Sequence, residues 1–278
     1  MKDFKIELKR AFYNRKFLIA LLLGFSIAIY NYVTNIGLTD IYEFGVQYEK
    51  YNMETPQGLF THNIISAPLE LPITLFFYGI IILGALPYAD SYVIDKNTGF
   101  NKNILSRTSR KNYYIFKWIA VFFSGFITCL SVILFNFLLN MTILPLLSPI
   151  VDGMGNSYGQ DSSQFLLDLF TNHPILHFLL FAIIISVYIG VISTYGLLSS
   201  SFSENRFIAI LTPFLIIQSL GVVQKLLRND LIYLPININT GNGQINLTLA
   251  FFEIVTMGIV SFIVYTFLEE KRSHSLGV

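Results

Sequence analysis

Residues 175–198 read ILHFLLFAIIISVYIGVISTYGLL and contain no aspartate, glutamate, lysine or arginine. The hydrocarbon core of a bilayer is ~30 Å thick, and about 20 consecutive apolar residues in a helix are needed to cross it. A run of this length, with no charge on any side, is too apolar for the surface of a soluble domain. The stretch therefore predicts a membrane-spanning helix.

Working outward from this stretch, further segments of the same kind lie on both sides of it. The six segments are Phe17–Val33, Leu71–Tyr88, Tyr113–Leu139, Ile175–Leu198, Phe207–Val223 and Leu247–Leu268. Composition agrees, since 54% of the residues are hydrophobic and only 13% are charged, against roughly 25% charged in soluble domains. We predict an all-α integral membrane protein with six transmembrane helices.

The lysines and arginines are distributed unevenly between the two sides of these segments. If the N-terminus is cytoplasmic, only Lys50, Lys225 and Arg228 of the 18 basic residues lie outside. Because basic residues accumulate in short cytoplasmic loops, this bias places both termini in the cytoplasm. It also argues against nucleic-acid binding, because the basic residues are accounted for by the ends of the spans.

The first 16 residues form an expected interfacial helix. Its apolar residues Phe4, Leu8, Ala11 and Phe12 recur at helical spacing, and Lys2, Lys5, Lys9 and Arg10 are available for the polar side. Such a helix is expected to lie in the membrane plane, with its cations near anionic headgroups. The alternative is a basic tail that only sets the topology.

The rest of the chain offers no segment large enough for a separate soluble domain, so residues 1–278 are expected to form a single transmembrane domain. Residues 224–246 lie outside the membrane in this topology. Within them, Leu226–Pro235 is fairly apolar but too short to cross. This pattern predicts a short re-entrant element before the last helix.

The cytoplasmic loop 89–112 and the beginning of the next span carry the most distinctive pattern. Residues 89–117 read ADSYVIDKNTGFNKNILSRTSRKNYYIFK. An acid is followed by a glycine, an apolar pair, a turn rich in Ser, Thr and Arg, and a basic, tyrosine-bearing helix start. The pattern predicts a short amphipathic helix and turn that docks on a partner. A solvated basic connector is the alternative.

This pattern resembles the permease subunits of type-2 ABC exporters, in which the same loop couples to the ATPase subunit. The residues that match in order are Asp95, Gly99, Ile104, Leu105, Arg110, Tyr113 and Lys117. Arg107 lies within the same expected coupling surface. The match departs from the family pattern in two places, because Asp95 stands where glutamate is commoner and no proline precedes Arg110. The interfacial helix, the six spans and the re-entrant element also resemble this family.

The resemblance implies partners and a location. A separate ABC ATPase, present in two copies, would bind ATP and Mg²⁺, and a second permease chain would complete a homodimer or heterodimer in the bacterial plasma membrane. The family exports amphipathic or peptide-like substrates, in some cases as immunity to antimicrobial peptides. The sequence contains no G-x-x-x-x-G-K-[ST] phosphate loop, so we expect a non-catalytic subunit without a cofactor of its own.

Three polar residues within the spans are candidates for a translocation path. Glu253 lies six residues into the last segment, ~9 Å from its outer end at 1.5 Å per residue. Asn136 and Gln218 lie in the outer halves of their spans. Intramembrane carboxylates usually face a cavity or a partner, but hydrogen bonds between neighbouring helices are an alternative role for all three.

Two other functional classes remain open. A secondary transporter built from two inverted three-helix halves would also have six spans, although such carriers usually hold several intramembrane charges. An intramembrane enzyme is the third reading. The H-E-x-x-H and G-x-S-x-G patterns are both missing, and the pair His173 and His177 has no recognisable third metal ligand. We therefore expect neither a catalytic nor a metal site.

Overall fold

The computed structural model describes residues 2–38, 59–60, 63–66, 71–100, 109–144, 146, 166–227 and 247–275, which form nine helices and no strand. The helices are α1 (Lys2–Phe12), α2 (Arg15–Leu38), α4 (Leu71–Ala85), α5 (Ser91–Asn97), α7 (Arg110–Asn140), α8 (Leu167–Asn172), α9 (Pro174–Phe202), α10 (Arg206–Leu227) and α11 (Leu247–Ser275). The expected all-α architecture is confirmed for this part of the chain.

Five of these helices, α2, α7, α9, α10 and α11, are long and apolar enough to cross a membrane. The predicted second span, 71–88, is different. Its helix α4 has 15 residues and ends at Ala85, a length of ~22 Å at 1.5 Å per residue. The structure thus supports a multi-pass membrane protein with five full-length spans and one shorter apolar helix.

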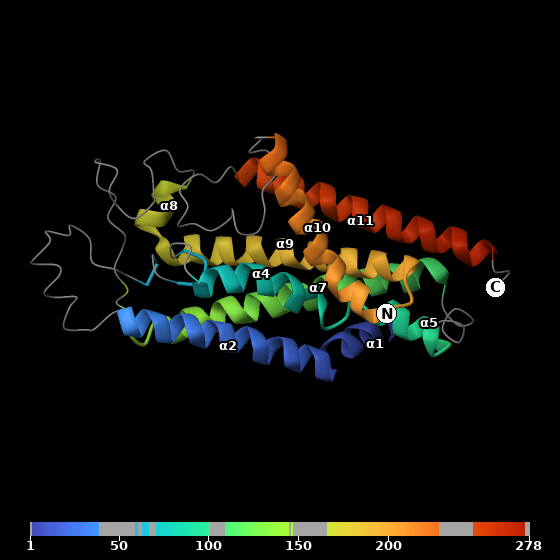
Figure 1. Cartoon of the computed structure of the whole chain (residues 1–278), viewed down its shortest axis with the longest axis horizontal. Coiled ribbons are helices and arrows are strands. Elements are labelled where there is room, and N and C mark those ends of the chain that lie inside the picture. The colour runs from blue at the N-terminus through green and yellow to red at the C-terminus, as the bar shows by residue number, and fades with distance from the viewer. Residues whose placement is uncertain are drawn as a thin grey trace, which may run out of the picture.

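The longer helices run side by side between two ends of an elongated bundle (Figure 1). At one end, which we call the α5 end, side chains of α1, α5 and α7 meet, and Tyr92 of α5 contacts Glu269 of α11. At the opposite end, Asn35 near the end of α2 bonds to Asn140 at the end of α7. Helix α1 and the last turns of α11 both lie toward the α5 end (Figure 1).

Helix α9 forms the centre of the bundle and contacts α4, α7, α10 and α11. Within its most apolar window 61% of the residues are buried, against 17% for α10 and α11. Helix α9 carries no charged residue on any face, which is compatible with neighbours on all sides. The peripheral helices instead expose large apolar side chains, such as Leu22 of α2 and Phe251 of α11, as expected for surfaces that face lipid.

Small residues allow the central helices to approach one another closely. A Cβ atom added at Gly196 of α9 would lie 2.3 Å from the backbone oxygen of Ala209 in α10. One added at Gly125 of α7 would lie 2.5 Å from Oγ of Ser193 in α9. Such contacts suit membrane helices, where close backbone packing replaces the hydrophobic driving force.

A sharp elbow at Tyr13 and Asn14 separates α1 from α2. The Asn14 amide Nδ2 donates to the carbonyl oxygens of Arg10 (2.9 Å) and Ala11 (2.8 Å), and Oδ1 accepts from the backbone N–H of Phe17 (2.7 Å). Nδ2 also reaches the carbonyl oxygen of Pro87 at 3.2 Å, just beyond α4. One side chain thus caps two helices and ties the elbow to α4.

The helix expected within residues 1–16 is present as the separate helix α1, and its position in the membrane interface stays a prediction. The expected re-entrant element 224–246 is only partly described. Gln224–Leu227 belongs to the end of α10, and 228–246 lies outside the described residues.

Candidate functional site

The candidate site is built around α5, a helix of seven residues that follows α4 after a short turn. Gly99 has a φ of +69°, which ends this helical segment by a backbone conformation that other residues rarely adopt. No atom lies within 4 Å of a Cβ built on Gly99, so the backbone, not a lack of space, requires glycine. The helix turns Ser91, Tyr92, Val93 and Asp95 into the protein.

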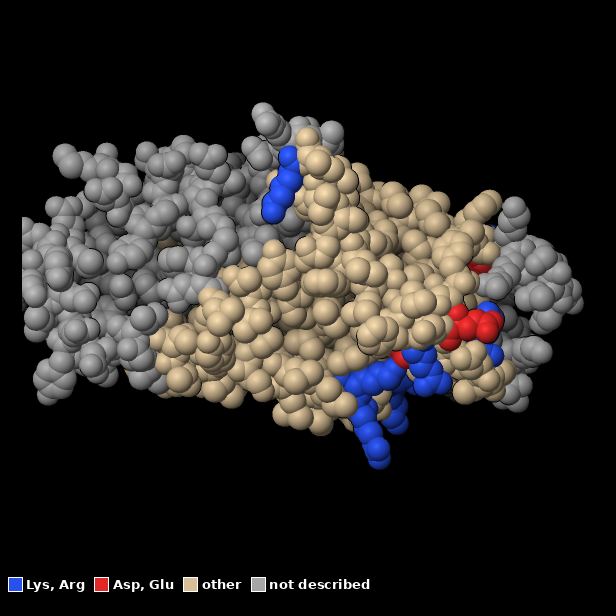
Figure 2. All heavy atoms as spheres, viewed as in Figure 1, with Lys and Arg blue, Asp and Glu red and all other residues tan. Residues whose placement is uncertain are grey.

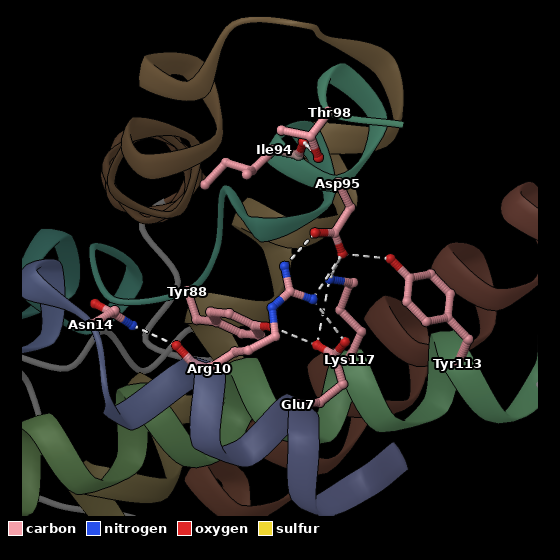
Figure 3. A network of polar contacts seen from close by, with 9 residues as sticks. All are labelled: Glu7, Arg10, Asn14, Tyr88, Ile94, Asp95, Thr98, Tyr113 and Lys117. Carbon is pink, nitrogen blue, oxygen red and sulfur yellow. Dashed lines mark hydrogen bonds and ion pairs between the residues drawn. The ribbon is translucent and has the colours of Figure 1, made fainter. Parts of the chain in front are cut away.

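Asp95 is fully buried and lies at the centre of a network of polar contacts (Figure 3). Its carboxylate pairs with the guanidinium of Arg10 from α1. It also accepts hydrogen bonds from the Tyr113 hydroxyl (2.7 Å) and the Lys117 Nζ (2.5 Å), both on α7. A single side chain of α5 is therefore held by two other helices.

A second carboxylate, Glu7 of α1, completes the cluster. It pairs with Nη1 of Arg10 at 3.0 Å and with Nζ of Lys117 at 3.5 Å. It also accepts a hydrogen bond from the Tyr88 hydroxyl at 2.5 Å. Two carboxylates thus face two cations, and the cluster is neutral overall, which lowers the cost of burying Glu7, Asp95 and Lys117 beside the half-buried Arg10. We refer to Glu7, Arg10, Asp95 and Lys117 as the ion cluster.

Aromatic rings close the cluster from the sides. Nζ of Lys117 lies 5.3 Å from the ring centre of Tyr88 and 5.1 Å from that of Tyr113. The Arg10 guanidinium lies 4.4 Å from the ring of Phe100, just beyond Gly99. At these distances the rings add cation–π attraction to the ion pairs.

The environment of Asp95 keeps its carboxylate in the charged form. Burial by itself raises the pKa of Asp95, but the charge of Lys117 and the hydrogen bond and charge of Arg10 outweigh it and hold that pKa below its ordinary value.

Two further contacts join α5 to the rest of the bundle. The Tyr92 hydroxyl donates to the buried carboxylate of Glu269, near the end of α11, and the Tyr92 ring meets that of Tyr265 edge-on. On the surface, Lys96 pairs with Glu204 at 2.8 Å, between α9 and α10. Because α5 is attached to α1, α7 and α11 by buried polar groups, a displacement of α5 would be transmitted to those helices.

The structure brings together three of the predicted coupling residues, Asp95, Tyr113 and Lys117, which are up to 22 positions apart. Gly99 ends the α5 segment. Arg110 begins α7, but its side chain lies outside the described residues. The predicted residues Ile104, Leu105 and Arg107 belong to 101–108, which the structure does not describe.

The three predicted path residues have hydrogen-bond or packing partners of different kinds. Glu253 of α11 accepts a hydrogen bond from the Tyr188 hydroxyl of α9 at 2.9 Å. Asn136 is fully buried and donates to Oδ1 of Asn31 in α2 at 2.8 Å. Gln218 lies half-buried on α10. Glu253 and Asn136 therefore form the hydrogen bonds between helices that were the alternative to a path role.

His177, one of the two histidines noted in the sequence, packs against aromatic side chains. His177 is buried, with ring contacts to Phe170 at 4.9 Å and Phe181 at 4.6 Å. In the described parts of the chain, no three histidine, cysteine or acidic residues are grouped in a way that could hold a metal ion.

Sequence reasoning did not assign Glu7, Arg10 and Tyr88 to the site. Arg10 was counted among the cations that face headgroups, whereas the structure turns it inward to Asp95. A usable signal was present in α1, since Glu7 precedes Arg10 by three positions and such pairs share one face of a helix. The partner across the cluster is 85 residues away from Arg10, and the sequence pattern does not reveal that pairing.

Comparisons with known proteins add no relative, because no family model, curated protein or solved structure matches this chain.

Proposed function

We propose that this chain is the membrane-spanning permease subunit of an ATP-driven exporter of the ABC type, which moves an amphipathic or peptide-like substrate out of the cell. The observation that carries the proposal is the convergence of Asp95, Tyr113 and Lys117 on one buried ion cluster. These residues matched the coupling loop of type-2 exporters by order alone. In the structure, Tyr113 and Lys117 of α7 bond to Asp95 and so anchor α5 to the bundle. This contact is a physical reason for the three residue types to occur together.

The path of the chain supports six crossings with both termini cytoplasmic. Hydrogen bonds of the helical type continue beyond Ala85, from Leu86 N–H to the Ile82 oxygen (2.9 Å) and from Ala89 N–H to the Ala85 oxygen (3.0 Å). Counted to Ala89, the α4 segment has 19 residues and reaches ~28 Å, which is close to the thickness of the hydrocarbon core. Together with the positive-inside bias, this length supports a cytoplasmic α5 end; the bacterial plasma membrane is the location that the resemblance to type-2 ABC exporters implies.

In this function, two copies of a separate ATPase bind ATP and Mg²⁺ and press on the loop that contains α5. The ion cluster passes the displacement to α1 and α7, and the contact between Tyr92 and Glu269 passes it to α11. The balance between inward- and outward-open states then shifts by the difference in ATP binding energy between them. A second permease chain, identical or related, forms the other half of the pathway.

The test is affinity purification of the detergent-solubilised protein from its native host, followed by mass spectrometry of the chains that come with it. We expect an ATPase with a G-x-x-x-x-G-K-[ST] motif to co-purify. The double variant Ile104→Asp/Leu105→Asp should lose that ATPase. A control, Leu146→Asp, places one carboxylate at an exposed apolar residue outside the coupling loop and should retain the ATPase.

The other outcomes distinguish the remaining classes. Transport by the protein alone in vesicles, driven by an ion gradient without ATP, would replace the proposal with a secondary transporter. Cleavage or transfer of a membrane-embedded substrate by the purified chain would replace it with an intramembrane enzyme.

A further inference from the structure

Helix α1 separates its polar residues into two sets. Glu7 and Arg10 face the protein interior as members of the ion cluster, and Asn14 connects the elbow to the Pro87 carbonyl oxygen. Lys5 and Lys9, one helical turn apart, are exposed instead. From the sequence alone, all the basic residues of α1 are expected to face headgroups. In the structure, Arg10 pairs with Asp95 inside the protein, and Lys5 and Lys9 are exposed.

A third exposed cation, Arg15, lies just after the elbow at the beginning of α2. Lys5, Lys9 and Arg15 form no ion pair with any acidic residue that the structure describes. Figure 2 shows basic side chains gathered over α1 and the start of α2 on this face of the molecule. We call Lys5, Lys9 and Arg15 the elbow patch; its three positive charges have no counter-charge within the described chain.

The surroundings of the elbow patch indicate what kind of anion fits it. Tyr13, which is 84% exposed, lies under Nζ of Lys9 at 6.0 Å from the ring centre. Directly beyond the patch, α2 exposes Leu18 (59%) and Leu22 (56%). This order matches a membrane leaflet from outside to inside. The cations would lie at the level of the headgroups, Tyr13 at the interface, and the apolar face of α2 among the acyl chains.

An amphiphilic anion matches both parts of this surface. Because Leu18 and Leu22 of a membrane-spanning α2 face lipid, the anions nearest to both the cations and these side chains are lipid headgroups rather than a soluble acidic protein or a nucleic acid. The phosphate of an anionic glycerophospholipid satisfies the cations while its acyl chains cover α2. We propose that Lys5, Lys9 and Arg15 bind the headgroup phosphates of anionic glycerophospholipids, and that this binding fixes the position of α5.

The second half of this proposal follows from the contacts of α1. A lipid held at the elbow patch restrains α1 from its outer side, and Arg10 joins α1 to Asp95 of α5 on the inner side. Asn14 fixes the elbow to the turn after α4, which leads directly into α5. The lipid therefore stabilises the position of α5. Its effect on coupling rests on the proposed function, whereas lipid binding does not.

Lipid binding is tested with the purified full chain in a neutral detergent. Dioleoylphosphatidylglycerol is titrated against it, with dioleoylphosphatidylcholine as the zwitterionic reference, and retained lipid is counted by native mass spectrometry. A basic residue near an anionic surface contributes about 1 kcal/mol, or roughly fivefold in affinity. The triple variant Lys5→Gln/Lys9→Gln/Arg15→Gln should therefore bind phosphatidylglycerol at least tenfold more weakly, and high salt should weaken binding by the wild type.

The matched comparison is Lys9→Gln against Lys225→Gln, because Lys225 is also exposed but lies near the end of α10. Only Lys9→Gln should lower the retention of phosphatidylglycerol. Equal retention of both lipids by the wild type, or equal losses in the two single variants, would overturn the lipid site. Inorganic phosphate competing as well as the lipid would show a simple anion site, which also overturns it.

The effect on α5 is measured by hydrogen–deuterium exchange of residues 91–97, without any ATPase. Phosphatidylglycerol should slow exchange in the wild type but not in the triple variant. The variant Asp95→Asn should keep the affinity for the lipid yet lose the protection of α5. Lipid binding without slower exchange would overturn the link to α5, while failure to find an ATPase would overturn only the proposed function.

Discussion

Asp95 is buried in an ion cluster whose two carboxylates balance two cations. Removing its charge is therefore expected to lower the free energy of unfolding. Neutralising it leaves Lys117 and Arg10 facing only Glu7, with one positive charge uncompensated in a buried site. Breaking a buried ion pair in this way typically costs about 3–5 kcal/mol, more than the intact pair contributes. The cluster therefore fixes the arrangement of α1, α5 and α7 more than it adds net stability.

The variant Asp95→Asn is expected to lower the unfolding temperature of the purified protein in detergent by several degrees. The control is Lys96→Gln, on the same helix, which removes an ion pair to a Glu204 side chain that is 74% exposed. Such a surface pair contributes about 0–1 kcal/mol. Differential scanning fluorimetry of the two variants is the measurement, and equal shifts would contradict the central role of Asp95.

Acid is expected to act on the same residue. The pKa of Asp95 is lower in the folded protein than its ordinary value, which is about 3.9 in an unfolded chain. Its contribution to stability is thus complete above that value and is lost as the pH falls through the lower, folded pKa. Unfolding temperatures of the wild type and Asp95→Asn, compared between pH 7 and pH 3, should converge as the pH falls. A constant difference across this range would contradict the prediction.

At the scale of helices, close backbone contacts decide how α9 fits its neighbours. Gly196 and Gly258 both lie in helices, but a Cβ at Gly196 meets the backbone oxygen of Ala209 at 2.3 Å, whereas one at Gly258 meets only side-chain atoms of Val191, at 3.7 Å or more. The first contact requires α10 to move away from α9. The second is an ordinary van der Waals distance.

We therefore expect Gly196→Ala to destabilise the protein by about 1–3 kcal/mol, the usual cost of overpacking. Gly258→Ala should be neutral or slightly stabilising, because alanine favours a helix over glycine by up to about 1 kcal/mol. Thermal unfolding of both variants in the same detergent is the measurement. A loss of equal size at Gly258 would show that the spacing between α9 and α10 does not control stability.

At the scale of the whole molecule, the passage of the chain along the bundle predicts which residues are accessible from each side. Asn97, exposed at the end of α5, and Lys225, exposed near the end of α10, should lie on opposite sides of the membrane. In a Cys129→Ala background, a membrane-impermeant maleimide should label Lys225→Cys in intact cells. It should label Asn97→Cys only after lysis. Labelling of Asn97→Cys in intact cells would reverse the topology.

Composition and the length of the apolar runs were enough to predict an all-helical membrane protein and the approximate positions of its helices. Long uncharged runs such as 175–198 can satisfy their backbone hydrogen bonds in lipid only as helices, so composition and length suffice to predict them. The chain order of Asp95, Tyr113 and Lys117 also indicated a functional loop. These patterns involve residues close together in the chain, so they can be recognised from the sequence alone.

Which charges pair with one another depends on the three-dimensional packing of the helices. Arg10 lies 85 residues from Asp95, and Tyr92 lies 177 residues from Glu269, so no periodicity links the members of these pairs. The inward turn of Arg10 also left Lys5, Lys9 and Arg15 as the exposed cations of the elbow. The physical reason is the cost of burying charge. A cation becomes internal only where packing of distant helices supplies a carboxylate, and that depends on the whole fold.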